Sequence, residues 1–75
     1  PASNKLFLNF DLNGSKAVGI KVYNLLGDAV QSTLNKILDQ GNHQLEIPLT
    51  GLIKGVYFLK IDIDGELVYH KIVIE

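Results

Sequence analysis

Residues able to perform acid–base, metal or nucleophilic chemistry are few in this chain, and they stand apart from one another. The two histidines, His43 and His70, lie on different alternating segments, and no cluster of acidic residues accompanies either of them. A metal ligand or a catalytic base needs partners that converge on it and hold it in place. We therefore expect neither histidine to belong to a catalytic or metal-binding site.

The acidic segment of residues 62–66 (DIDGE) superficially resembles a calcium-binding loop. It lacks the twelve-residue series of ligands and the bidentate glutamate that ends such a loop, so a turn is the better interpretation. Nucleophilic catalysis by a hydroxyl group requires an adjacent base. No such base is paired in the sequence with the isolated hydroxyl residues Ser15, Ser32, Thr33 and Thr50. The sequence predicts a protein that is not an enzyme and that uses no cofactor, metal ion or small-molecule substrate.

The composition favours a single small domain and argues against several kinds of partner. The chain has 75 residues, seven of them basic and eight acidic, with a net charge of −1. Because no basic stripe is present, nucleic acid is not an expected partner. The absence of cysteine excludes a thiol nucleophile and a cysteine-ligated zinc. No apolar run approaches the roughly 20 residues of a membrane-spanning helix.

Residues 1–4 (PASN) lack the basic start and apolar centre of a signal peptide. We expect them to continue from a linker in a longer chain, with residues 1–75 forming one domain.

Alternation of apolar and polar residues is the dominant pattern, and it predicts short β-strands. The alternating segments are residues 5–12, 17–24, 29–34, 43–49, 56–63 and 66–75. No segment has a helical period. Six or seven short strands spaced in this way predict an all-β protein, an antiparallel β-sandwich. Its expected core contains Leu8, Phe10, Ile20, Val22, Leu45, Ile47, Leu59 and Ile61.

Residues 35–42 form the least regular stretch. We expect Ile37 and Leu38 to tuck under a connection that ends at Gly41. Pro48 has no N–H group for a strand ladder, so it indicates an edge strand or the end of a strand.

Two turns are predicted from glycine. Gly27 is expected to supply a left-handed residue, and Asp64-Gly65 matches a two-residue type I′ hairpin turn. With that turn, Leu59 faces His70 and Tyr57 faces Ile72. We then expect His70 to lie at the rim of the core as a neutral, hydrogen-bonded residue.

The same register places apolar residues on the other face of this terminal hairpin as well. Val56 and Phe58 would lie beside Val73 and Lys71, and Lys60 beside Tyr69. A neighbouring loop or an upstream domain could cover this face, and β-propensity alone could also explain it. The functional alternative is a docking surface.

Several blocks of the sequence together resemble the C-terminal sorting domain of the type IX secretion system, type A. Pro1-Ala2 is similar to the end of the opening motif of that family, and residues 22–30 (VYNLLGDAV) to its central strand–turn–strand motif. Gly41-Asn42-His43 resembles its Gly-x-His step. Residues 52–61 (LIKGVYFLKI) and 71–74 (KIVI) resemble its last two blocks. The resemblance covers the whole chain in the same order, and the Pro-Asn half of the opening motif is absent.

The resemblance implies an Ig-like sandwich at the C-terminus of an exported Bacteroidota protein. Its partners would be an upstream passenger domain, the type IX translocon and a sortase-like protease that removes the domain. The passenger would cross the periplasm and reach the cell surface or the extracellular space. The candidate signal residues are Gly55, Tyr57, Lys71, Ile72, Val73, Ile74 and Glu75. Gly27, Asp64 and Gly65 are assigned to turns.

A permanent accessory sandwich beside a secreted enzyme, adhesive or carbohydrate-binding, is the alternative. Carbohydrate sites usually present exposed aromatic side chains with polar neighbours. Tryptophan is absent, and only Tyr23 and Tyr69 are candidates for this role.

Overall fold

The computed structural model describes residues 5–75, which contain six β-strands and no helix. The strands are β1 (Lys5–Leu12), β2 (Lys16–Tyr23), β3 (Ala29–Leu38), β4 (Gly41–Pro48), β5 (Gly55–Ile63) and β6 (Glu66–Ile74). The predicted linker in residues 1–4 lies outside the described residues. The described part of the chain therefore offers no helix that is long and apolar enough to cross a bilayer.

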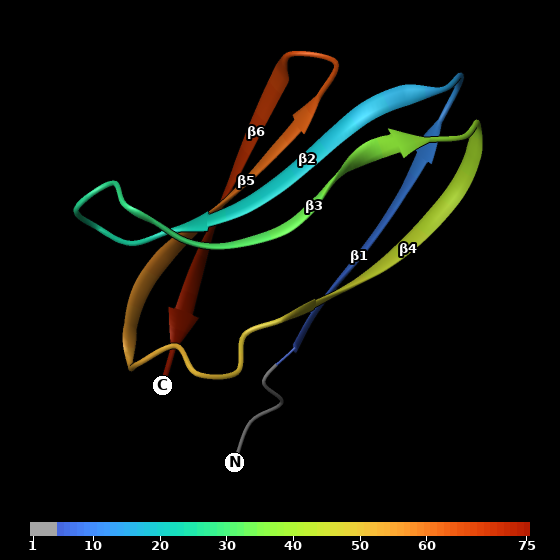
Figure 1. The fold of residues 1–75 in the computed structure, drawn as a ribbon. Coiled ribbons are helices and arrows are strands. Elements are labelled where there is room, and N and C mark those ends of the chain that lie inside the picture. Colours follow the sequence, from blue (N-terminus) through green and yellow to red (C-terminus); the bar gives the residue numbers. More distant parts are fainter. Residues whose placement is uncertain (1–4) are drawn as a thin grey trace.

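The six strands form two antiparallel sheets that face each other (Figure 1). The smaller sheet pairs β1 with β4, and the larger has the order β3-β2-β5-β6. Every pairing is antiparallel. The predicted all-β antiparallel sandwich is confirmed, and the arrangement is consistent with an Ig-like fold.

The core fills the space between the sheets. The buried apolar side chains are Leu12, Val18, Ile20, Val22, Leu38, Ile47, Leu49, Tyr57, Leu59, Ile61 and Ile72. Five of the eight predicted core residues are among them. The other three, Leu8, Phe10 and Leu45, are only partly buried and pack against this cluster. They lie on the smaller sheet, which is two strands wide, so solvent reaches its inner face from both sides.

Strand β3 is longer than the alternation predicts, because it runs through Leu38 without a break. Two register shifts leave Thr33 and Val30 without partners on β2, and such bulges interrupt the two-residue period of the side chains. Ile37 pairs with Ala17 on the outer face and is 71% exposed, whereas Leu38 is buried. The expectation that Ile37 tucks under a connection is therefore wrong.

Candidate functional site

The candidate signal residues gather at one end of the terminal hairpin of β5 and β6. In its ladder Gly55 pairs with Ile74, Tyr57 with Ile72, and Leu59 with His70. This is the register expected from a two-residue turn. Strand β6 runs from that turn down to the C-terminus (Figure 1), so the candidates lie at the end of the hairpin opposite the turn.

Two of the candidates face the core and stabilise the sandwich. Tyr57 is 6% exposed and Ile72 is 8% exposed. The Tyr57 hydroxyl donates a hydrogen bond to the Ile53 carbonyl oxygen at 2.6 Å, which ties the loop after β4 to β5. A partner that binds the folded domain would therefore reach neither side chain directly.

The remaining candidates are accessible to different degrees. Lys71 and Glu75 are exposed, and Val73 is 55% exposed beside Val56. Ile74 is partly buried and packs against the core. Gly55 has a φ of 151°, a value at which side chains are strained. The end of β6 thus combines one exposed cation, one exposed apolar side chain and one exposed carboxylate.

Strand β6 also forms an edge of the larger sheet, with β5 as its neighbour on one side. An edge strand presents backbone N–H and C=O groups that can pair with another strand. Natural edges are often protected by charges or bulges. Over its nine residues, β6 carries charged side chains only at Glu66 and Lys71.

The inner face of β6 is only partly covered. Val68 pairs with the buried Ile61, yet it is 47% exposed. His70 pairs with the buried Leu59 and is also exposed. Among residues 5–75 its imidazole has no hydrogen-bonding partner, so the expectation that the His70 side chain is hydrogen-bonded is wrong. It does lie beside the core, since it lines a hollow together with Leu59 and Ile72. The cause of the exposure of His70 is again the narrow smaller sheet, which does not extend over this part of β6.

A shallow hollow follows from this incomplete cover. It lies between the two sheets where β1 approaches β6, and Leu6 and Leu8 line it opposite His70 and Ile72. The side of the sandwich beside the β6 edge is therefore open and mostly apolar.

The turns at the two ends of the sandwich are set by glycine and by side-chain hydrogen bonds. Asp64 and Gly65 have φ values of 50° and 90°, as a type I′ turn requires. Asp64 also pairs with the start of β2: its carboxylate accepts the Ala17 N–H at 2.8 Å, and its own N–H donates to the Ala17 carbonyl at 2.9 Å. In the other turn, Gly27 has a φ of 90°.

Residues that are distant in the sequence lie together on the outer face of the larger sheet. Tyr23 and Tyr69, the two candidate carbohydrate-binding residues, line one hollow together with Phe58 and Lys60. The Lys60 ammonium lies 5.3 Å from the centroid of the Tyr23 ring, within the range of a cation–π contact. Sequence reasoning did not find this cluster, because it depends on the pairing of β2 with β5.

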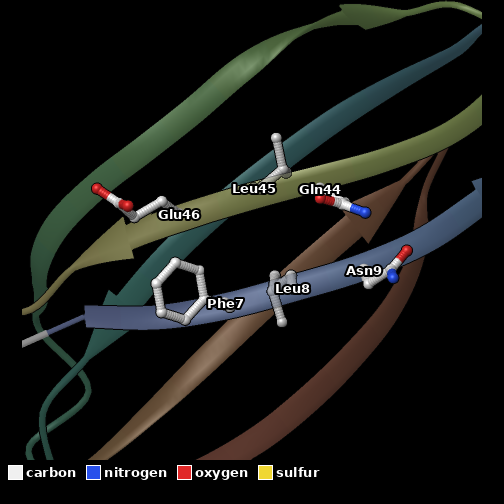
Figure 2. Close-up of a pocket in the computed structure, with 6 residues that line it drawn as sticks. All are labelled: Phe7, Leu8, Asn9, Gln44, Leu45 and Glu46. Carbon is white, nitrogen blue, oxygen red and sulfur yellow. The ribbon is translucent and has the colours of Figure 1, made fainter. Parts of the chain in front are cut away.

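A third hollow lies on the smaller sheet. Figure 2 shows its lining side chains on the two neighbouring strands: Phe7, Leu8, Asn9, Gln44, Leu45 and Glu46. Phe7 is 68% exposed, and Lys5 forms an ion pair with Glu46 at 3.4 Å. The lining contains one carboxylate and no cation, so it does not suit an anionic ligand.

The other groups that could do chemistry have structural roles. His43 stacks at 5.8 Å against Phe10, and its Nε2 lies 2.6 Å from the Asp39 carbonyl oxygen. Within residues 5–75, no three His, Cys, Asp or Glu side chains gather in a way that could hold a metal ion.

Comparison with known proteins gives one result. A family model described as "Secretion system C-terminal sorting domain" matches residues 1–75, the whole chain. Searches of curated proteins and of solved structures gave no match.

Proposed function

Since the chain belongs to the secretion system C-terminal sorting domain family, a family of sorting signals for type IX secretion, we propose that it directs an upstream passenger across the outer membrane. The match along the whole chain is the observation that carries this proposal. Residues 1–75 would act as one domain at the C-terminal end of a longer secreted protein. The domain itself would be non-catalytic. Its role would be to present a surface that the translocon binds.

We place the recognised surface at the end of β6. The translocon would pair a strand with the free backbone groups of the β6 edge, which gives affinity, and would read side chains at alternate positions, which gives specificity. Lys71 and Val73 point to the outer face and are accessible in the folded domain. The buried Tyr57 and Ile72 would hold the edge in shape.

The passage of the protein follows from this role. The folded or folding domain would be met in the periplasm, and the passenger would emerge at the cell surface or outside the cell. A sortase-like protease would remove the domain and join the passenger to the surface. The terminal hairpin would thus act as a sorting signal that is recognised during export and then removed by proteolysis.

A secretion assay tests this proposal. A fluorescent passenger is fused ahead of Pro1 and expressed in a cell with a working type IX system. We expect the intact fusion to reach the surface or the medium, and the fusion without residues 71–75 to stay in the periplasm. Because that deletion also removes the core residue Ile72, the sharper variant is Lys71→Ala.

Lys36→Ala is the matched control, since Lys36 is an exposed lysine on β3, at the opposite edge of the same sheet. Each substitution should change the free energy of unfolding by no more than about 0.5 kcal/mol. We expect Lys71→Ala to reduce export while Lys36→Ala does not. Normal export of the fusion without residues 71–75 would contradict the sorting role. If Lys71→Ala is exported normally while the truncated fusion is not, Lys71 is not part of the recognised signal.

A further inference from the structure

The hollow that holds Tyr23 and Tyr69 has the features of a ligand site on the outer face of the larger sheet. We name it the aromatic hollow, lined by Tyr23, Phe58, Lys60 and Tyr69, with Asn24, Leu25 and Gly27 of the β2–β3 turn. Its volume is about 560 Å³, which lies within the usual range for sites that bind small molecules. It faces away from the core and from the open side of β6.

Aromatic rings and ammonium groups lie close together on this face. The strand register places Lys21, Lys60 and Tyr69 in one row across β2, β5 and β6. The adjacent row contains Tyr23, Phe58 and Lys71. Three aromatic rings and three cations therefore occupy six neighbouring positions on the outer face of the larger sheet.

The aromatic hollow is positively charged. Its cation is Lys60, and a side-chain hydrogen bond with Tyr23 raises the pKa of this lysine above its ordinary value. A lysine is protonated at neutral pH at its ordinary pKa, and the direction of this shift favours the same charged form. None of the lining residues is acidic. The carboxylate nearest in register is Asp62, which lies one row further along β5, between Gly19 and Leu67.

Hydrogen-bonding groups complete the lining. The Asn24 side-chain oxygen accepts the N–H groups of Leu26 and Asp28, each at 3.0 Å. Because the oxygen is occupied, Asn24 can bind a ligand through its NH₂ group, as a hydrogen-bond donor. The hydroxyls of Tyr23 and Tyr69 can both donate and accept. The hollow thus combines aromatic faces, hydroxyls, an amide donor and a cation.

We propose that the aromatic hollow binds an anionic saccharide, a sugar unit that carries a carboxylate or a phosphate. The apolar C–H face of a sugar ring would lie against the aromatic rings, and its hydroxyls would bond to the tyrosines and Asn24. The acidic substituent would pair with Lys60. The lining of the hollow includes neither Lys71 nor Val73, the two side chains that the translocon is proposed to read.

The location of the aromatic hollow disfavours an acidic peptide as its ligand. Peptides that bind sheets usually add a strand at an edge. Here Tyr23, Phe58 and Tyr69 lie on β2, β5 and β6, and the backbone groups between these strands are engaged in the ladders of the sheet. A ligand that lies over β2 and β5 has side chains to bind and no free backbone, because free backbone groups are found only along the outer edge of β6.

Titration of the ¹⁵N-labelled chain tests the proposal. The probes are a tetrasaccharide of galacturonic acid, a neutral tetrasaccharide (cellotetraose) and a tetraglutamate peptide. We expect the acidic saccharide to shift amide resonances around Tyr23, Phe58 and Tyr69, and to bind at least tenfold more tightly than the other two probes. Tyr69→Ala and Lys60→Gln should each weaken its binding about tenfold or more.

The controls use matching residues outside the hollow. Phe7→Ala removes an exposed ring from the smaller sheet, and Lys36→Ala removes an exposed cation from β3; neither should change the affinity. Dispersed spectra of all four variants establish that they are folded. The proposal is overturned if the galacturonate probe does not bind, if cellotetraose binds as well, or if tetraglutamate binds more tightly.

Discussion

The turn between β5 and β6 gives the sharpest test of the fold, through the substitution Gly65→Val. Gly65 has a φ of 90°, and a Cβ atom built on it would meet no other atom within 4 Å. The added Cβ atom thus meets no clash, and we expect the loss of stability to come from the backbone conformation. A residue with a Cβ in the left-handed region costs about 1–2 kcal/mol, and a β-branched residue lies at the upper end because it is a genuine outlier there.

Gly14→Val is the matched control. A Cβ atom at Gly14 also meets nothing within 4 Å, but this glycine is not among those with a positive φ. Both substitutions reduce the freedom of the unfolded chain, which favours the native state by about 0.4–1 kcal/mol where the new residue fits. The difference between the two variants thus isolates the strain at position 65.

Thermal unfolding followed by circular dichroism measures this difference. For a domain of this size, 1 kcal/mol corresponds to about 4–8 °C in melting temperature. We expect Gly65→Val to melt about 5–15 °C below Gly14→Val, and Gly65→Asn to recover most of the loss, because asparagine tolerates positive φ. Equal melting temperatures for the two valine variants would refute the type I′ turn, and with it the register that places Lys71 on the outer face.

Two further predictions concern packing around the hairpin. Leu59→Ala should lower the free energy of unfolding by about 2–5 kcal/mol, because Leu59 is completely buried. Leu26→Ala, at a position that is 86% exposed, should change it little. Urea unfolding measures both variants, and similar losses of stability would argue against the described core. Tyr57→Phe should cost about 1 kcal/mol through the lost hydrogen bond to Ile53, and a melting temperature equal to that of the unchanged chain would show that this bond contributes nothing.

The features that follow from the sequence are those set by neighbouring residues. Asp64-Gly65 specifies its turn locally, and the turn then fixes the whole register of β5 with β6. Alternation likewise identified all six strands, including residues 29–34 of β3, which contain both bulges. It missed the end of β3, where Lys36 pairs with the buried Val18 and the apolar Ile37 lies on the outer face.

The width of the smaller sheet and the aromatic hollow could not be predicted in this way. The hairpin register predicts a hydrogen-bonded His70 at the rim of the core, but the exposure of this residue depends on how far β1 and β4 extend over β6. The hollow depends on Tyr23 facing Phe58 across β2 and β5, a pairing between distant segments. No local pattern fixes which strands become neighbours.

The short connection of the terminal hairpin has a consequence for the order of events in folding. A hairpin with a two-residue turn forms in about 1–10 μs, and β5 and β6 need only each other to form their ladder. Strand β1 must find β4, a pairing that joins Lys5 to Pro48 across most of the chain, and such long-range closure is slow. We expect the hairpin to form while β1 is still unpaired. A receptor that reads β6 could then engage the chain before the sandwich has closed.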